Sequence, residues 1–281
     1  MKEYRLTLEM LEGYREHLYR EERAPATVEK YVRDTRSFVL FLNGRPVCKE
    51  RAIEWRDLLL DNGRTPVTVN AKLSALNGLF RFLGWESCRI RFLKIQRRIF
   101  RERSKELTRE EYLRLLKTAQ NAGQERLELL MEAICSTGIR VSEVRYLTVE
   151  AAQMGQAVIQ LKGKIRTILL PRKLCRKLLK FAKKQEVAVG EIFLSKGGKS
   201  LSRKLIWQEM KRLCAKAGVE PSKVFPHNLR HLFATAFYRI CRDIVKLADV
   251  LGHSPVETTR LYLLTAGAEH ARYLEQLRLM I

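Results

Sequence analysis

The 281-residue sequence has no long hydrophobic run. No stretch approaches the ~20 consecutive apolar residues that a membrane-spanning helix needs. The first ten residues, MKEYRLTLEM, also lack the apolar core of a signal peptide. We therefore expect a protein that is neither secreted nor inserted in a membrane, and its expected location is the cytoplasm.

Paired cysteines are also missing. The six cysteines lie far apart and form no C-x-x-C pair, which argues against a structural zinc site. A disulfide scaffold is typical of much shorter, secreted chains. We expect six reduced and mostly buried thiols, at Cys48, Cys88, Cys135, Cys175, Cys214 and Cys241.

Acidic residues are few compared with basic ones. Lys and Arg number 54 against 31 Asp and Glu, so the formal net charge is +23. Such self-repulsion does not help folding, but it attracts a polyanion. Nucleic acid is the leading candidate, because neutralising its phosphates releases condensed counterions. An acidic membrane surface would also fit the charge excess.

The first 88 residues predict a helical domain. Hydrophobic residues make up 46% of the chain, enough for a core, and the length suggests about two domains. Apolar residues recur at helical spacing after Thr27, the expected N-cap of the second helix. The pattern predicts a bundle of about four helices, near residues 7–22, 28–43, 52–63 and 68–84.

A strongly basic segment follows, at residues 89–106. Residues 89–105 contain eight basic residues and one acid, Glu102, and neither Gly nor Pro. One interpretation is a solvated linker or a helix with a charged face. The other is an interdomain strap that lies against a phosphate backbone. The expected DNA-binding residues are Arg89, Arg91, Lys94, Arg97, Arg98, Arg101 and Arg103, with Lys164 further along the chain.

A second domain is expected over residues 107–281. Thr108 and Glu111 form a capping-box pattern at a helix start. AVIQLKGKIRTILLP predicts two short strands around a tight turn at 162–164, and EIFLS at 191–195 predicts a further strand. The remaining segments predict helices, near residues 109–121, 125–137, 172–185, 202–217, 227–239, 242–251 and 256–264, with an amphipathic one from about 268.

Five short segments of this domain contain basic or nucleophilic side chains. Taken singly, each has an ordinary structural explanation: arginines cap helices, a turn lysine is solvated, and a tyrosine in an apolar stretch belongs to the core. The segments are STGIRVSE with Arg140 and Glu143, QLKGKIR with Lys162 and Lys164, PHNLRH with His227 and Arg230, LGHS with His253, and TTRLY with Tyr262.

Together the five segments predict phosphodiester transfer without a metal. The forked guanidinium groups of two arginines can each donate two hydrogen bonds to the charged non-bridging oxygens of the transition state. A tyrosine can act as a covalent nucleophile, and a lysine or histidine can protonate the leaving oxygen. No carboxylate cluster suited to Mg²⁺ accompanies the motifs, which argues against a two-metal nuclease.

In order and wording, the segments resemble the signature of the tyrosine recombinase, or phage integrase, family. STGIRVSE, PHNLRHLFAT and LGHSPVETTRLY carry the resemblance, with Tyr262 nine residues after His253. It covers the whole second domain, and the basic helical first domain resembles the family's core-binding domain. The implied fold is mainly α with a small antiparallel sheet, its two domains clamping a DNA duplex.

The resemblance also implies a role for each residue. Tyr262 would attack the scissile phosphate and form a 3′-phosphotyrosine bond, while Arg140 and Arg230 clamp the phosphate oxygens. His227 would assist proton transfer and His253 would hydrogen-bond the phosphate. Glu143 would orient the other residues. The energy of the cleaved phosphodiester is conserved in the covalent bond between protein and DNA, so no metal, ATP or other cofactor is implied.

The hairpin departs from the family pattern. Relatives often read G-K-G-x-K-x-R, whereas this chain reads L-K-G-K-I-R, one residue shorter. Lys162 aligns with the lysine that protonates the departing 5′-oxygen, and Lys164 remains the alternative.

The family also implies an assembly. Four protomers would act together on a double-stranded recombination site and exchange a C-terminal segment that includes AEHARYLEQLRLMI. That last helix could instead pack on its own domain. The chain starts directly in the helical domain, which favours a simple Xer-like member, with a second recombinase or an accessory protein as further partners.

Two other functions compete with recombination. A topoisomerase with a similar tyrosine and arginine–histidine set would relax supercoils as a monomer. A catalytically idle protein of the same fold would only bind DNA, although all six expected catalytic positions hold a competent residue.

Overall fold

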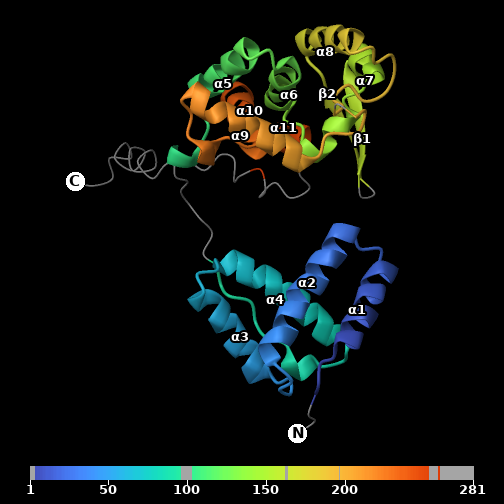
Figure 1. Ribbon diagram of the computed structural model, residues 1–281, viewed down its shortest axis with the longest axis vertical. Helices are drawn as coiled ribbons and strands as arrows, with labels where there is room; N and C mark the ends of the chain where they lie inside the picture. The colour runs from blue at the N-terminus through green and yellow to red at the C-terminus, as the bar shows by residue number, and fades with distance from the viewer. Residues whose placement is uncertain (1–3, 96–102, 162–163, 196, 253–258, 260–281) are drawn as a thin grey trace, which may run out of the picture. The chain divides into compact units, whose positions relative to one another are not determined.

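The computed structural model describes residues 4–95, 103–161, 164–195, 197–252 and 259. Clustering of the chain's contacts divides it into two compact units, Met1–Arg97 and Arg98–Ile281. Figure 1 shows a helical first unit and a second unit that combines helices with a hairpin. Within the described residues, no helix is both long and apolar enough to span a bilayer.

The first unit is built on four helices. Its helix α4 carries the most apolar face, and Leu73, Leu76 and Phe80 are completely buried against Phe38 and Trp55. The helices are α1 (Leu8–Arg20), α2 (Pro25–Leu42), α3 (Lys49–Asp61) and α4 (Pro66–Phe82), followed by the short 3₁₀ turn η1 (Glu86–Cys88).

The start of α2 corrects the expectation for Thr27. The helix begins at Pro25, three residues before the expected start at residue 28, and Ala24 is its N-cap. The Thr27 backbone N–H donates to the Ala24 carbonyl at 2.7 Å, so Thr27 lies inside the first turn. Proline suits this position because its fixed φ is helical and its missing N–H has no partner to lose.

Two asparagines of α4 hold the start of the basic segment. The Asn77 amide accepts from the Ile90 backbone N–H at 3.1 Å and donates to the Ile90 carbonyl at 2.9 Å. The Asn70 amide makes the same pair of bonds with Leu93, at 2.8 and 2.9 Å. Because Ile90 is also buried, residues 90–93 form part of the first unit.

The second unit places a hairpin among helices. Strands β1 (Gln156–Leu161) and β2 (Lys164–Leu169) are antiparallel, with Gln156 opposite Leu169 and Leu161 opposite Lys164. The α-helices are α5 (Arg109–Asn121), α6 (Glu125–Thr137), α7 (Val149–Met154), α8 (Arg172–Lys184), α9 (Arg203–Ala217), α10 (Pro226–Cys241) and α11 (Ile244–Leu251). The 3₁₀ turns are η2 (Arg103–Lys105), η3 (Val141–Tyr146) and η4 (Pro221–Lys223).

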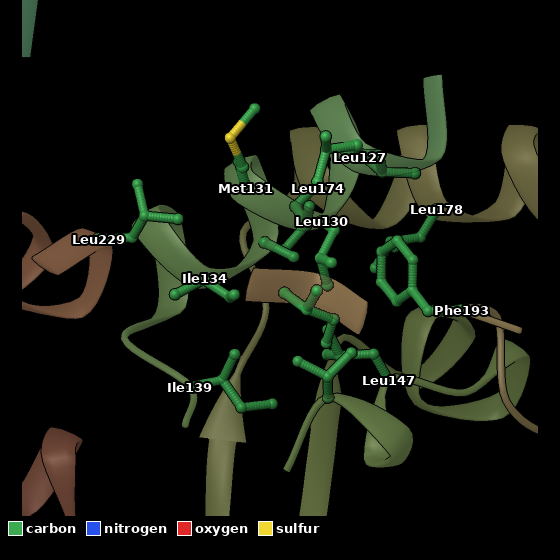
Figure 2. Close-up of a cluster of buried hydrophobic side chains, with 14 of the residues drawn as sticks. Leu127, Leu130, Met131, Ile134, Ile139, Leu147, Leu174, Leu178, Phe193 and Leu229 are labelled. Carbon is green, nitrogen blue, oxygen red and sulfur yellow. The ribbon is translucent and has the colours of Figure 1, made fainter. Parts of the chain in front are cut away.

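Most expected elements of the second unit are confirmed. The capping box of Thr108 and Glu111 is present at the start of α5. The core lies around α6, where Leu130, Met131 and Ile134 are almost fully buried (Figure 2). The fold is therefore mainly α with a small antiparallel sheet, as predicted.

The prediction of a strand at residues 191–195 is wrong. This segment makes only two isolated bridges, Thr148 with Glu191 and Leu194 with Ser200. Ile192 and Phe193 are neighbours and both are 1% exposed. Neighbouring side chains of a flat strand point to opposite faces, so burying both in one core requires the bends seen here. Helix α7 and turn η3 were not expected.

The cysteines form no disulfide. All six are free, with Cys88, Cys175 and Cys214 buried and the other three half-buried. Burial raises the pKa of the Cys135 thiol to about 12, so this side chain stays protonated at neutral pH.

Candidate active site

The site is organised around the end of α6. Gly138 closes this helix in the left-handed conformation, with a φ of +65°. A Cβ at this position would lie 2.4 Å from the Phe233 ring, so only glycine fits. Two residues later Arg140 is the N-cap of η3, and its side chain is 35% exposed.

Glu143 is the buried anion of the site. One carboxylate oxygen accepts from the Arg140 backbone N–H at 2.9 Å and from Arg166 Nη2 at 2.5 Å. The other accepts from Arg140 Nη1 at 2.9 Å. Burial alone would raise the pKa of Glu143, but these hydrogen bonds and the charges of Arg166 and Arg140 hold it below its usual range. Glu143 therefore fixes the orientation of two arginines.

Three arginines converge on the last carbonyls of α11. Arg166 Nη1 donates to the Leu251 carbonyl at 2.5 Å, and Arg230 Nη2 donates to the same oxygen at 2.8 Å. Arg140 Nη2 donates to the Gly252 carbonyl at 3.1 Å. The C-terminus of a helix leaves carbonyls without intrahelical partners and carries partial negative charge, which explains why cations gather there.

Arg230 is the most deeply placed of the three. It lies in α10, is 2% exposed, and also donates to the Gly138 carbonyl. It thereby connects the end of α6 to the end of α11. A buried guanidinium must be hydrogen-bonded in this way to offset its lost hydration.

Gly252 lets Arg166 reach this position. Its φ is +62°, and a Cβ there would lie 2.5 Å from Arg166 Cδ and 2.6 Å from Nη1. Any other residue would push the arginine away from both Leu251 and Glu143. The glycine of the LGHS segment is therefore required by packing as well as by the turn.

Arg166 is the member that sequence reasoning missed. It lies on β2, opposite Ile159, and its side chain is 16% exposed. Burial lowers the pKa of its guanidinium, while Glu143 opposes this effect. The available signal was the arginine that ends the family's hairpin pattern, which this chain retains in L-K-G-K-I-R.

The structure thus brings together Arg140, Glu143 and Arg230 of the predicted set. His227 lies in the first turn of α10 with an exposed side chain. Lys164 begins β2, so its backbone is in the strand rather than in the turn. The expected catalytic residues Lys162, His253 and Tyr262 lie outside the described residues.

The predicted DNA-binding residues are split in the same way. Arg89 is half-buried, whereas Arg91 and Lys94 are exposed in the first unit. Arg103 lies in the short turn η2. Arg97, Arg98 and Arg101 lie outside the described residues. In the described part of the chain, no group of three or more His, Cys, Asp or Glu side chains is placed to hold a metal ion.

Arginines gathered around a buried glutamate, on a mainly helical chain of two units, suit a protein that binds the phosphates of DNA. The chain belongs to the phage integrase family, whose model matches residues 105–268. The N-terminal SAM-like domain of phage integrases matches residues 11–87.

The similar proteins of known name are tyrosine recombinases. The chain is 29% identical to tyrosine recombinase XerA of Pyrococcus furiosus, over 99% of both chains. It is 31% identical to tyrosine recombinase XerD of Brucella suis, over 73% of this chain and 74% of the relative.

Solved structures share the fold. A lambda integrase tetramer bound to a Holliday junction matches with a TM-score of 0.75 at 18% identity, covering 93% of this chain and 78% of that one. XerH bound to its difH substrate matches with a TM-score of 0.70 at 20% identity, covering 95% and 84%.

Proposed function

We propose that the chain is a site-specific DNA recombinase that cuts and rejoins strands through a 3′-phosphotyrosine bond at Tyr262. The observation that carries the proposal is the joint fixation of Arg140 and Arg230 on the carbonyls of Gly252 and Leu251, immediately before His253. Relatives named tyrosine recombinases, matching up to 99% of the chain, support recombination over supercoil relaxation.

In the proposed reaction the Tyr262 oxygen attacks the scissile phosphorus. The bond from phosphorus to the 5′-oxygen breaks, and that oxygen takes a proton from Lys162. His227 would assist the proton transfer, and His253 would hydrogen-bond the phosphate. A 5′-hydroxyl of a partner strand then attacks the phosphotyrosine, which restores the phosphodiester and releases the tyrosine. One phosphodiester is exchanged for another, so neither ATP nor a metal is needed.

The arginines would stabilise the charge that develops on the phosphate. A guanidinium has five N–H donors, and Arg140 uses one for Glu143 and one for Gly252 in the bonds described above. Because the Arg140 side chain is 35% exposed, it can also donate to a phosphate oxygen. Arg230 would add a fixed charge from the buried side, with no reorganisation during the reaction.

The partners and assembly belong to the same proposal. We expect the chain to bind double-stranded recombination sites, and four protomers to assemble through the C-terminal segment. The lambda integrase tetramer and the XerH–difH complex support this expectation by their shared fold. A second recombinase or an accessory protein could take part, and the expected location remains the cytoplasm.

A covalent adduct provides the direct test. A DNA sequence selected for binding from a random pool is nicked near its centre, so that a cleaved strand diffuses away and traps the intermediate. We expect a denaturant-stable adduct that forms equally well in excess EDTA, because arginines replace the metal. Tyr262→Phe should abolish the adduct and leave DNA affinity within about twofold, since it removes one oxygen.

Each contrary result has a distinct meaning. An adduct that persists in the Phe variant would assign the nucleophile to another residue. A wild-type protein that binds the DNA but never forms an adduct would favour the idle DNA-binding protein. Cleavage that needs Mg²⁺ would indicate a nuclease.

A further inference from the structure

Helix α8 presents a strongly basic face that the proposed reaction does not use. Its sequence, RKLCRKLLKFAKK, contains basic residues at more than half of its positions and no acid. The apolar residues point inward: Leu174, Leu178 and Phe181 are at most 5% exposed and pack in the core. The basic residues on the remaining surface are Arg172, Lys173, Arg176, Lys177, Lys180, Lys183 and Lys184.

Few of these charges are neutralised within the protein. Lys177 pairs with Glu132 at 2.7 Å and Lys184 with Glu125 at 2.5 Å. Across residues 103–252 as far as they are described, no carboxylate lies within 4 Å of the other basic side chains of α8. The face therefore retains a net positive charge after its internal pairs are counted.

Lys183 and Lys184 suit the last turn of the helix, but the basic residues at its start do not serve its stability. Arg172 and Lys173 occupy the first turn, where the helix dipole disfavours cations, and that turn holds no acid. Like charges four residues apart, such as Arg172 and Arg176, also repel. A charge pattern that works against its own helix is explained by an external anion.

The C-terminal end of the face lies away from the arginine cluster. Lys184 pairs with Glu125, the first residue of α6, whereas Arg140 follows the opposite end of that helix. Helix α6 has thirteen residues, so Glu125 lies roughly 20 Å from the end of the helix that precedes Arg140. Figure 1 shows α8 at one edge of the second unit, next to α6 and α7.

The chemistry of the face fits a DNA backbone. Residues 172, 176, 180 and 184 form a row along the helix, rising ~6 Å per step, a spacing similar to that of successive phosphates on one strand. A membrane surface fits less well, because amphipathic helices insert apolar residues and those of α8 are buried in its own unit.

We propose that α8 is a second DNA-binding surface, which holds a duplex segment other than the one cleaved at the arginine cluster. The segment would be flanking DNA or a neighbouring duplex, bound through its phosphates without regard to sequence. The inference rests on the proposed function for its choice of DNA as the anion.

The test compares two variants with the same change in charge. The α8 variant combines R172Q, K173Q, R176Q and K180Q. The control combines R109Q, K117Q, R212Q and K216Q, which are exposed residues of α5 and α9. Full-length proteins are titrated with a long random-sequence duplex at several salt concentrations, and thermal melting checks that both variants fold.

We expect the α8 variant to bind about tenfold more weakly, with the slope of log K against log salt shallower by ~0.9 for each lost phosphate contact. The control should lose less than about twofold. Equal losses in both variants would reduce the effect to net charge and overturn the proposal, as would unchanged binding. Poly-glutamate serves as a second polyanion in the same titration. If the α8 variant lost affinity for poly-glutamate but not for DNA, the face would be assigned to an acidic protein, and the proposal would be overturned.

The adduct assay keeps the two proposals apart. On a short nicked duplex at saturating protein, the α8 variant should form the Tyr262 adduct at the wild-type rate. If the wild-type protein forms no adduct, the proposed function fails while the salt slopes still report on α8.

Discussion

Arg166 joins parts of the candidate active site that come from three distant segments of the chain. Its two terminal nitrogens bind Glu143 and the Leu251 carbonyl, so one side chain fixes both the η3 turn and the end of α11. Because Glu143 in turn orients Arg140, Arg166 acts on the phosphate clamp without needing to touch the substrate. We regard it as a positioning residue.

Arg166→Gln should therefore slow cleavage more than it weakens binding. A misplacement of about 1 Å in an active site can cost about 100-fold in rate, and we expect a loss of that order in single-turnover adduct formation. DNA affinity should fall by less than about threefold, because the residue is 16% exposed. Arg166→Lys keeps the charge and should recover part of the rate. Parallel loss of rate, affinity and melting temperature in both variants would indicate a general structural role.

A second question at the scale of single residues is which lysine acts as the general acid that protonates the departing 5′-oxygen. Lys162 is the expected donor, and Lys164 is the alternative because the hairpin is one residue shorter than the family pattern. Lys164 begins β2 and pairs with Leu161 of β1. Lys162 lies outside the described residues, so its role as the general acid stays a prediction.

A substrate with a 5′-bridging sulfur separates the two lysines. Sulfur leaves as a thiolate and needs little protonation, so the substrate bypasses a missing acid. Lys162→Ala should cleave ordinary DNA very slowly and the sulfur substrate almost normally. Lys164→Ala should only weaken binding, with a shallower salt dependence. The opposite pattern would transfer the role to Lys164, and rescue of neither variant would move the proton to His227.

Among the elements, the segment 90–93 shows how a basic stretch can be part of a fold. Its backbone is held along α4 by Asn70 and Asn77, which lie seven residues apart and so face the same side of the helix. Each amide supplies one donor and one acceptor, as a neighbouring strand would. Asn77 is 7% exposed and Ile90 is 5% exposed, so these bonds are shielded from water.

Asn77→Ala should loosen this segment. It would leave the buried N–H and carbonyl of Ile90 without partners, at a cost of about 1–3 kcal/mol for each group. Hydrogen exchange in the full chain should show protection of the Ile90 amide falling by at least about tenfold. Asn70→Ala, at a half-buried position, is the matched control and should affect Leu93 less, because water can replace the lost bonds. Unchanged exchange at Ile90 would show that packing alone holds the segment.

The elements also show what sequence patterns can predict. The capping box at Thr108 and the helices 109–121 and 125–137 were expected with their correct bounds, because local signals determine them. Thr27 failed as a cap because Pro25, two residues earlier, is the stronger start signal. The segment 191–195 resembles a strand locally, but the core that buries both Ile192 and Phe193 comes from distant residues.

At the scale of the whole molecule, the sequence motifs named three residues that only the structure could place side by side. The sequence motifs contain Arg140, Glu143 and Arg230, and the structure brings these side chains together. Arg166 was missed although it ends the family's hairpin pattern, because the pattern alone does not show what a strand arginine contacts. Its importance appears only once β2, η3 and α11 are adjacent. The charge excess was visible from composition, whereas its concentration on α8 required knowing which side of the helix is buried.

The three arginines at the end of α11 bind main-chain oxygens, and this has an evolutionary consequence. A carbonyl belongs to every residue, so substitutions along α11 cannot delete the acceptors that hold Arg140, Arg166 and Arg230. Related proteins can therefore carry different residues in α11 and still hold the three arginines in place. A single insertion or deletion within α11 would instead shift these acceptors relative to the three arginines. Apart from Gly252, this part of the gene must therefore preserve the length of the helix more than the identity of its residues.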